Sequence, residues 1–324
     1  PYTSVQFSGR IIPPFFLYGV NHTIYITLNA SWNKQLQCVI VTIIRELRDY
    51  LKSPAYSADG LLNWQMELSI IIVCYNSERY INTCLDSIFG YKINYNYETI
   101  VADNNSNDST KTIVSSYVPK VTLIKNSKNI GFAGAINVGI QESKGKFLLI
   151  LNPDIILKGN TINKLLQFAS SEESIGIIAP KLLNPDGTLQ ESCRAFYSVK
   201  TIILRRTIFG KIFPNTDTIK KHLMLDWDHN TPMNVDWILG ACFLIRREVL
   251  ERCVGYFDED YKLYFEDVDI CYRMKEAGYK VCYYPSATCI HDHRRESAKG
   301  FNRKTYWHIR SAIHFFNKHG WRFW

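Results

Sequence analysis

The chain has 324 residues, enough for one large domain or two ordinary ones with a sizeable hydrophobic core. Its composition, 46% hydrophobic and 21% charged, is ordinary for a soluble globular protein, and no apolar run approaches the roughly 18 residues of a membrane span. The formal net charge of +8 has two explanations of about equal weight. One is an anionic partner such as phosphate, nucleic acid or a lipid surface, and the other is simple solubility.

The nine cysteines form no C-x-x-C pair at zinc spacing. An odd number of scattered cysteines predicts reduced, mostly buried thiols in a cytosolic protein. The N-x-S/T triplets are therefore expected to carry no glycan. The chain starts at Pro1 and shows no signal-peptide pattern, so we expect it to be a piece of a longer protein.

Residues 1–66 differ in character from the rest and are predicted to form an extension, the tail of a preceding module. The stretch 11–32 is aromatic and β-branched with turn residues between, which predicts one or two short strands. Residues 34–51 have apolar side chains at helical spacing, and the Ser53-Pro54 breaker ends this predicted helix. Its apolar face needs a cover, and packing on the following domain is favoured over contact with a membrane or a partner.

From Leu68 onward, short apolar strands alternate with amphipathic helices, which is typical of βαβ units and a mostly parallel sheet. The predicted strands are 68–75, 97–106, 121–126 and 146–154, and two more follow Gly278. The predicted helices are 77–89, one after Asp108, one from near Gly131, and a C-terminal helix from about Tyr306 that ends in basic and aromatic residues.

Polar side chains follow three of these strands, at the edge where ligands bind in parallel sheets. They are Tyr75 and Asn76, Asp103 and Asn104, and Asn152 and Asp154. Any one of them alone is better explained as a cap or an Asx turn, but three strands that end alike indicate a ligand site. The loop NIGFAGAINVG (129–139) adds glycines at a helix start, where backbone N–H groups can meet an anion. It is neither GxGxxG after the first strand nor a P-loop.

The stretch YFEDVDICYRMKEAGY (264–279) places Glu266, Asp267 and Asp269 among apolar side chains. Carboxylates are favoured at the first turn of a helix, which explains one or two of them. It does not explain their apolar flanks, because a buried carboxylate without a partner is costly. Asp269 is expected to pair with Arg273 one turn further on.

Seven motifs occur in the order found in family 2 glycosyltransferases, and the chain resembles the bacterial rhamnosyltransferase-like branch over about residues 67–315. The motifs are VCYNSE, VADNNSNDST, NIGFAGAINVG, LNPDI, VDWILGACFLIRREV, GYFDEDYKLYFEDVDICYRMKEAGY and IHDHRRES. The resemblance implies the GT-A nucleotide-sugar-binding fold for residues 67–300, followed by a basic, aromatic helix in 301–324.

The resemblance also implies roles for single residues. Asp103 would bind the pyrimidine base, with Tyr75 bordering the nucleotide and Asn129, Gly131 and Phe132 closing around the donor. Asp154 would be the last acid of a D-x-D metal motif whose first position is here Asn152, and His291 would join the metal or the diphosphate. His293 competes for that role, and a structural strand histidine is the alternative for His291. Asp267 would be the general base with Glu266 beside it, Trp237, Gly240 and Ala241 would line the sugar and acceptor pocket, and Arg194 would meet a phosphate or the acceptor.

The implied activity is an inverting transfer of L-rhamnose from dTDP-rhamnose, with Mg²⁺ or Mn²⁺, to a glycan or lipid-linked glycan. The implied setting is surface-polysaccharide or O-antigen assembly at the cytoplasmic face of a bacterial membrane, with peripheral membrane contact allowed and no nucleic-acid partner. Two alternatives stay open. The donor could be another sugar nucleotide such as UDP-galactofuranose or UDP-GlcNAc, or the domain could be a catalytically silent module of a larger synthase.

Overall fold

The computed structural model describes residues 66–206, 216–292 and 303–321, together with four short strands nearer the N-terminus. The chain divides into two units, residues 1–63 and 64–324. In the first unit the strands pair as antiparallel hairpins: β1 (Gln6–Phe7) with β2 (Arg10–Ile11), and β3 (Leu17–Val20) with β4 (Thr23–Ile26). This confirms the strands predicted in 11–32, whereas the predicted helix 34–51 lies outside the described residues.

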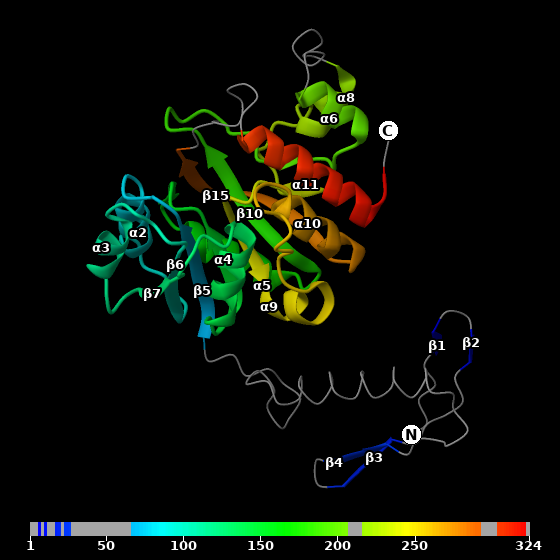
Figure 1. The fold of residues 1–324 in the computed structure, drawn as a ribbon, viewed down its shortest axis with the longest axis horizontal. Helices are drawn as coiled ribbons and strands as arrows, with labels where there is room; N and C mark the ends of the chain where they lie inside the picture. Colours follow the sequence, from blue (N-terminus) through cyan, green and yellow to red (C-terminus); the bar gives the residue numbers. More distant parts are fainter. Residues whose placement is uncertain are drawn as a thin grey trace. The chain divides into compact units, whose positions relative to one another are not determined.

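The second unit is built on one nine-stranded sheet (Figure 1). Its strands are β5 (Met66–Cys74), β6 (Tyr97–Asp103), β7 (Thr122–Lys125), β8 (Gly145–Leu151), β9 (Ile155–Lys158), β10 (Ile175–Leu183), β12 (Met233–Asn234), β14 (Cys242–Arg246) and β15 (Lys280–His291). They lie in the order β12-β15-β10-β14-β8-β5-β6-β7, with β9 beside β15. The pairings make β5, β6, β7, β8, β10 and β15 run in one direction and only β9, β12 and β14 in the other. The predicted mostly parallel α/β fold is confirmed.

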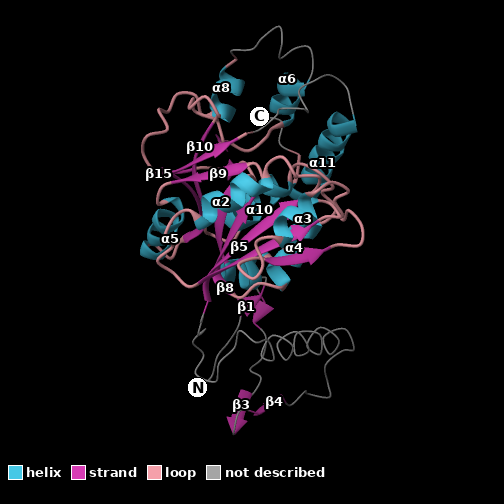
Figure 2. Cartoon of the chain, turned by 90° about the vertical axis from the view of Figure 1, so that its left-hand side faces the viewer, coloured by secondary structure: helices cyan, strands magenta, loops and turns pink. Residues whose placement is uncertain are grey.

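Helices cover both faces of the sheet, which explains why its central strands are almost continuously apolar (Figure 2). Side chains of a strand alternate between faces. In β5, Ile71 and Val73 join the core under α4 (Phe132–Gln141), α10 (Glu266–Glu276) and α11 (Arg303–His319), whereas Ile70 and Ile72 join the core under α2 (Ile81–Phe89) and α5 (Thr161–Ser171). The smaller elements are α3 (Thr110–Ser115), α6 (Val199–Arg206), α8 (Asp217–Leu223), α9 (Arg247–Val249), a π-turn (Leu250–Val254) and the ribbon of β11 (Cys193–Arg194) and β13 (Trp237–Ile238).

Several predicted elements have other bounds in the structure, and three of the differences are informative. Helix α2 begins at Ile81 and not at Ser77. Residues 78–80 form a turn before it, in which the Tyr80 and Ile81 N–H groups donate to the Ser77 carbonyl (2.9 and 3.0 Å), and the buried Ser77 N–H donates to the Thr110 hydroxyl (2.7 Å). Helix α11 begins at Arg303 instead of near Tyr306. After Gly278 there is one twelve-residue strand in place of two: β15 keeps pairing with β10 across a register shift around Pro285, a residue that cannot donate to a strand ladder.

All eight described cysteines are unpaired, and seven of them are buried. This agrees with the prediction of reduced, mostly buried thiols.

The carboxyl ends of the parallel strands meet at one edge of the sheet, and the antiparallel β14 starts at that same edge. The residues just before β14, Gly240 and Ala241, therefore lie beside those just after β8. The Asn152 N–H donates to the Ala241 carbonyl at 2.8 Å. The sheet thus brings together segments about ninety residues apart in the chain.

Candidate active site

The end of β6 carries a buried carboxylate. Asp103 is fully buried, and its Oδ2 accepts a hydrogen bond from the Ser106 N–H (3.0 Å). Its Oδ1 has no hydrogen-bond partner among the described residues. A buried polar atom without a partner is uncommon in a folded protein, so this oxygen is available to a ligand donor group.

The next residue fixes the glycine loop to this strand end. The Asn104 amide donates to Asn129 Oδ1 and to the Gly131 carbonyl, both at 3.0 Å, and Asn104 Oδ1 accepts from the Ile130 N–H (3.0 Å). Gly131 has φ 86°, a conformation that favours glycine, and it precedes α4. The predicted donor-site residues Asp103, Asn129 and Gly131 are therefore brought together, with Asn104 as the connection.

The other two residues predicted on this side have different surroundings. Phe132 is the first residue of α4 and packs partly against the core. Tyr75 follows β5 and is 50% exposed. An exposed aromatic ring at the ligand edge of a sheet can stack on a planar base without displacing any core contact.

Asp154 and His291 face one another across the same edge. His291 Nε2 lies 3.4 Å from Asp154 Oδ1, and the imidazole itself is buried. His291 Nδ1 lies 2.7 Å from Gln190 Oε1. Since Gln190 donates its own amide to Asn184 Oδ1 (3.0 Å), its oxygen faces the ring, and Nδ1 is the nitrogen that carries the hydrogen. The lone pair of Nε2 then points toward Asp154.

This arrangement fits a divalent cation. A carboxylate oxygen and an imidazole nitrogen 3.4 Å apart can share one ion at bond lengths of about 2.0–2.2 Å. Asn152 Oδ1 and Asp154 Oδ1 are buried and make no hydrogen bond within the described part of the chain. Gln190 holds the His291 ring in place through its hydrogen bond to Nδ1, as the residues behind metal-binding histidines commonly do. No motif in the sequence pointed to Gln190. His293, the competing candidate, lies outside the described residues.

The acidic pair lies at the start of α10, after two non-glycine residues in the left-handed region, Tyr264 (φ 68°) and Phe265 (φ 72°). Such strain tends to occur at functional sites. Asp267 Oδ2 accepts from the Gly240 N–H and Oδ1 from the Val268 N–H, both at 2.9 Å. A Cβ at Gly240 would lie 3.0 Å from the Asp267 Cβ, so the close approach requires glycine.

The surroundings act differently on the pKa values of the two acids, Asp267 and Glu266. Burial raises the pKa of Asp267, while hydrogen bonds from Gly240 and Val268 and the nearby Arg194 charge oppose the rise. Burial and the neighbouring Asp267 charge raise the pKa of Glu266 to about 8. Glu266 Oε2 is buried without a hydrogen bond in the described structure. Of the two, Asp267 has the surroundings that favour the charged form, whereas Glu266 has the raised pKa that favours the protonated form.

Arg194 lies on β11, one strand of the two-stranded ribbon, and its charge is near Asp267 of α10. Its guanidinium is 5.5 Å from the centre of the Trp237 ring, and one terminal nitrogen donates to the Glu191 carbonyl (3.2 Å). Its Nε and Nη1 have no hydrogen-bond partner within the described ranges. Trp237 is buried, and its indole N–H donates to the Ala195 carbonyl (3.0 Å), so this ring supports Arg194. The arginine has donors left for a phosphate or a hydroxyl.

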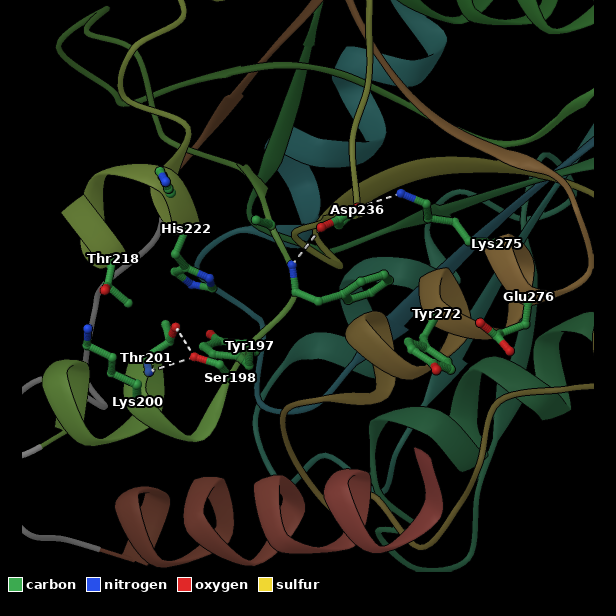
Figure 3. Close-up of a pocket in the computed structure, with 13 residues that line it drawn as sticks. Tyr197, Ser198, Lys200, Thr201, Thr218, His222, Asp236, Tyr272, Lys275 and Glu276 are labelled. Atoms are coloured by element: carbon green, nitrogen blue, oxygen red, sulfur yellow. Dashed lines mark hydrogen bonds and ion pairs between the residues drawn. The ribbon is translucent and has the colours of Figure 1, made fainter. Parts of the chain in front are cut away.

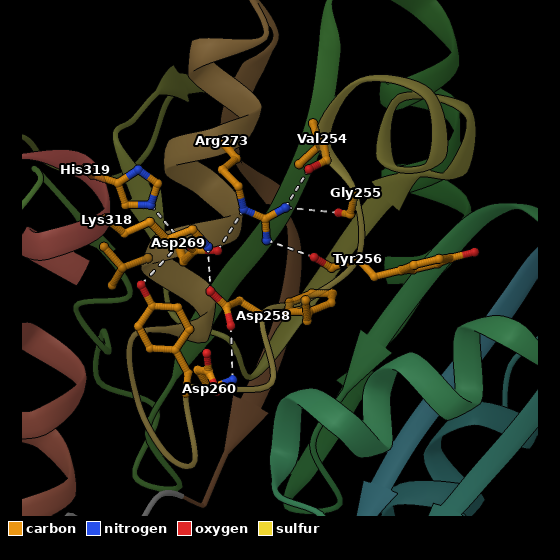
Figure 4. Close-up of polar contacts among 12 residues, drawn as sticks. Val254, Gly255, Tyr256, Asp258, Asp260, Asp269, Arg273, Lys318 and His319 are labelled. Carbon is orange, nitrogen blue, oxygen red and sulfur yellow. Dashed lines mark hydrogen bonds and ion pairs between the residues drawn. The ribbon is translucent and has the colours of Figure 1, made fainter. Parts of the chain in front are cut away.

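The third acid of the stretch has a structural role (Figure 4). Asp269 is fully buried and accepts from Arg273 Nε at 2.7 Å, which confirms the predicted pair. It also contacts two residues of α11, His319 Nε2 (2.7 Å) and Lys318 Nζ (2.9 Å). Burial would raise the pKa of Asp269, but the His319 hydrogen bond and the Arg273 and Lys318 charges outweigh it and hold the pKa well below its usual range. These α11 partners had no signal in the sequence.

A cavity of about 710 Å³ is lined by residues that follow β11 and precede β13, together with residues of α6, α8 and α10 (Figure 3). Three aromatic residues and three lysines are among those that line it: Phe196, Tyr197, Tyr272, Lys200, Lys221 and Lys275. None of the predicted site residues lines it. Two of its lining residues, Tyr272 and Lys275, lie on α10, the helix that begins at the acidic pair. Aromatic walls with dispersed polar groups and this volume suit a small-molecule or sugar site.

The chain is similar in sequence to known glycosyltransferases. The profile described as "Glycosyl transferase family 2" matches residues 69–254. The chain is 30% identical over 208 residues to the N-acetylglucosaminyl-diphospho-decaprenol L-rhamnosyltransferase of Mycobacterium tuberculosis, covering 59% of this chain and 65% of that protein's length. It is 25% identical over 258 residues to the rhamnosyltransferase WbbL of Escherichia coli K12, covering 76% of this chain and 91% of WbbL.

Two solved structures show the same fold. GalNAc-T7, crystallised with UDP, GalNAc and Mn²⁺, aligns with a TM-score of 0.59 at 17% identity, covering 88% of this chain and 57% of that one. The mannosyltransferase PcManGT of Pyrobaculum calidifontis, in complex with GDP-Man and Mn²⁺, aligns with a TM-score of 0.51 at 20% identity, covering 87% and 72%. The sheet and its helices are thus a GT-A fold. Among the described helices, none has the length and apolar character required to cross a membrane.

Proposed function

Since the chain belongs to glycosyltransferase family 2, we propose that it transfers a sugar, with inversion, from a nucleotide-diphospho-sugar to a hydroxyl of a glycan or lipid-linked glycan. The observation that carries the proposal is a set of buried polar atoms that make no hydrogen bond within the described residues. They belong to Asp103 and Asn152, at the carboxyl ends of β6 and β8, and to Arg194 and Glu266, on β11 and at the start of α10. Several such atoms indicate a polar ligand that completes them.

The chemistry follows from the protonation states. Asp267 accepts the proton of the acceptor hydroxyl as its oxygen attacks the anomeric carbon, and the bond from that carbon to the diphosphate oxygen breaks. Protonated Glu266 can donate a hydrogen bond to the acceptor next to this base. Asp154 and His291, with Asn152, would hold Mg²⁺ or Mn²⁺, which stabilises charge on a departing diphosphate. Asp103 would bind the base, and Arg194 would meet the diphosphate or the acceptor.

We propose dTDP-L-rhamnose as the donor, because the relatives from M. tuberculosis and E. coli are both described as rhamnosyltransferases. The diphospho-decaprenol in the name of the first supports a lipid-linked acceptor in surface-glycan assembly, at the inner face of a bacterial membrane. The cavity of about 710 Å³ would hold acceptor groups next to the reacting sugar, with its lysines facing any acidic or phosphorylated substituent.

The test is donor hydrolysis across a panel of sugar nucleotides, with Asp154→Asn as the control. The expected result is release of nucleotide diphosphate from dTDP-rhamnose well above that from UDP-galactofuranose or UDP-GlcNAc. A preference for either UDP-sugar would replace the donor but keep the activity. Tight nucleotide binding without hydrolysis or transfer of any donor would identify a silent module of a larger synthase.

The metal part has a separate test by calorimetry. With only one carboxylate in the motif, Mn²⁺ should bind weakly to the free protein and clearly more tightly when dTDP is present, because the diphosphate supplies further oxygen ligands. Asp154→Asn should abolish this gain. Equal Mn²⁺ affinity with and without dTDP would show that the diphosphate is not part of the metal site.

A further inference from the structure

Helix α11 is apolar on the side that faces water as well as on the side that faces the protein. Its inner side buries Ala312, Phe315 and Phe316 in the core. Its outer side exposes Tyr306 (55%), Ile309 (37%) and Ile313 (46%), three positions that share one helix face, and Trp321 (49%) follows the helix end. These four residues are called the outer stripe. A solvent-facing helix side normally carries charged or polar residues, so the stripe needs a partner.

The sequence at this end of the chain is basic, which favours an anionic partner. Residues 293–324 contain eight lysines and arginines and one acid, Glu296, a formal charge of +7 out of the +8 of the whole chain. Within the described helix, Arg310 is exposed next to the stripe, and its guanidinium lies 5.1 Å from the Trp307 ring. Exposed apolar and aromatic side chains among lysines and arginines are the composition of a helix that lies in an anionic membrane interface.

We infer that the outer stripe of α11 docks the protein on the surface of an anionic lipid bilayer. A second copy of the chain is a poorer partner on two grounds. Four side chains are few for a stable protein interface, which buries roughly 800 Å² per partner, and two faces of like charge would repel one another. Each basic residue near an anionic surface adds to the attraction, whereas the apolar side chains insert between headgroups.

The same helix is fixed to the catalytic helix. The Phe315 ring lies 5.6 Å from both the Phe265 and Tyr272 rings, and Lys318 and His319 contact Asp269 of α10. The docked helix would therefore set the height of Asp267 above the bilayer. The benefit to catalysis rests on the proposed lipid-linked acceptor, but the docking itself depends on neither donor nor acceptor.

The experiment is co-sedimentation of the whole protein with vesicles of phosphatidylcholine alone or with phosphatidylglycerol added, at low and high salt. The natural protein should bind the anionic vesicles, with affinity at least about tenfold lower on neutral vesicles or at high salt. The double variant Ile309→Glu/Ile313→Glu should lose at least about tenfold on anionic vesicles. Tyr91→Glu, which changes a similarly exposed ring (48%) outside α11, should bind as the natural protein does.

Two further measurements keep the result interpretable. Thermal unfolding and dTDP binding show whether the double variant is folded, and Arg310→Glu provides a milder variant that should reduce binding to anionic vesicles only. The inference is overturned if the natural protein shows no preference for anionic vesicles or if the double variant binds as well as the natural protein. A dimer in sedimentation velocity that the double variant dissociates would also overturn it. If the natural protein hydrolyses no donor, that result contradicts the proposed function and leaves the docking inference untouched.

Discussion

At the scale of single residues, Asp267 and Glu266 are neighbours in the chain with separate surroundings. Asp267 is held by two backbone N–H groups, from Gly240 and Val268, which favour its charged form. Glu266 has a buried oxygen without such a donor in the described structure and a pKa raised to about 8. This difference supports Asp267 as the proposed base and a proposed hydrogen-bonding role for Glu266.

The assignment of the base predicts the effect of Asp267→Asn. The amide keeps the size but cannot accept the acceptor's proton, so the transfer rate should fall by about a hundred- to ten-thousand-fold. The dissociation constant of the donor should barely change, because this side chain is assigned to the acceptor side. Rates from product analysis and donor affinities from calorimetry check both, with Asp154→Asn as a matched control that weakens donor binding too. Near-normal transfer by Asp267→Asn would show that the base is elsewhere.

The raised pKa of Glu266 predicts that kcat/KM falls at high pH. Below its pKa of about 8 it carries a proton and can donate a hydrogen bond, and above that pH it becomes a second negative charge beside Asp267. The profile of kcat/KM should therefore rise as Asp267 ionises and fall again above about pH 8. Glu266→Gln, which stays neutral and keeps a donor, should lose the alkaline fall. If the fall persists unchanged in Glu266→Gln, another group causes it.

At the scale of elements, Asp269 joins α10 to α11. Asp269→Asn removes one member of a buried ion-pair cluster, which typically costs about 3–5 kcal/mol of unfolding free energy. The exposed pair of Glu172 and Lys280 provides the control, since Glu172→Gln should barely move the urea midpoint. Unfolding midpoints of the three proteins at pH 7 check the comparison. Equal midpoints would show that Asp269 does not hold the two helices together.

The sign of the pH dependence follows from the direction of the shift. The folded pKa of Asp269 lies below the ordinary value of about 3.9, so its stabilisation is complete above that pH and is lost as pH falls toward the folded pKa. The gap between the natural protein and Asp269→Asn should therefore narrow as the pH falls below about 4. A gap that widens in acid would contradict this origin.

Helices, strands and contacts that follow from a local sequence pattern were predictable from the sequence. Contacts between segments far apart in the chain were not. The strands from Leu68 to Asp154, the helix after Gly131 and the Asp269–Arg273 pair follow from apolar runs, a glycine and helical spacing. Gln190 behind His291 and the α11 partners of Asp269 come from segments 101 and 50 residues away and have no local pattern. The two strands predicted after Gly278 form one because β10 pairs with both sides of the irregularity at Pro285.

At the scale of the whole molecule, the described core and the predicted site belong to residues 64–324. A protein consisting of residues 64–324 should therefore bind dTDP as tightly as the full chain does. The sequence also predicts that the helix 34–51 covers apolar surface, so the shorter protein should be less soluble, whereas deletion of residues 1–30 alone should leave solubility unchanged. Calorimetry and light scattering check the two parts. Unchanged solubility after the longer deletion would contradict the covering role.

The position of β14 also has a consequence for synthesis. This strand lies between β8 and β10 although it follows both in the chain. Until residue 246 has left the ribosome, the centre of the sheet has two open strand edges, LLIL on one side and IGIIA on the other, both strongly apolar. Open apolar edges pair readily with other chains. A nascent chain that stops before Cys242 is therefore expected to aggregate or to need a chaperone. The insertion of β14 also completes the edge on which Asn152 and Ala241 lie, next to Asp267.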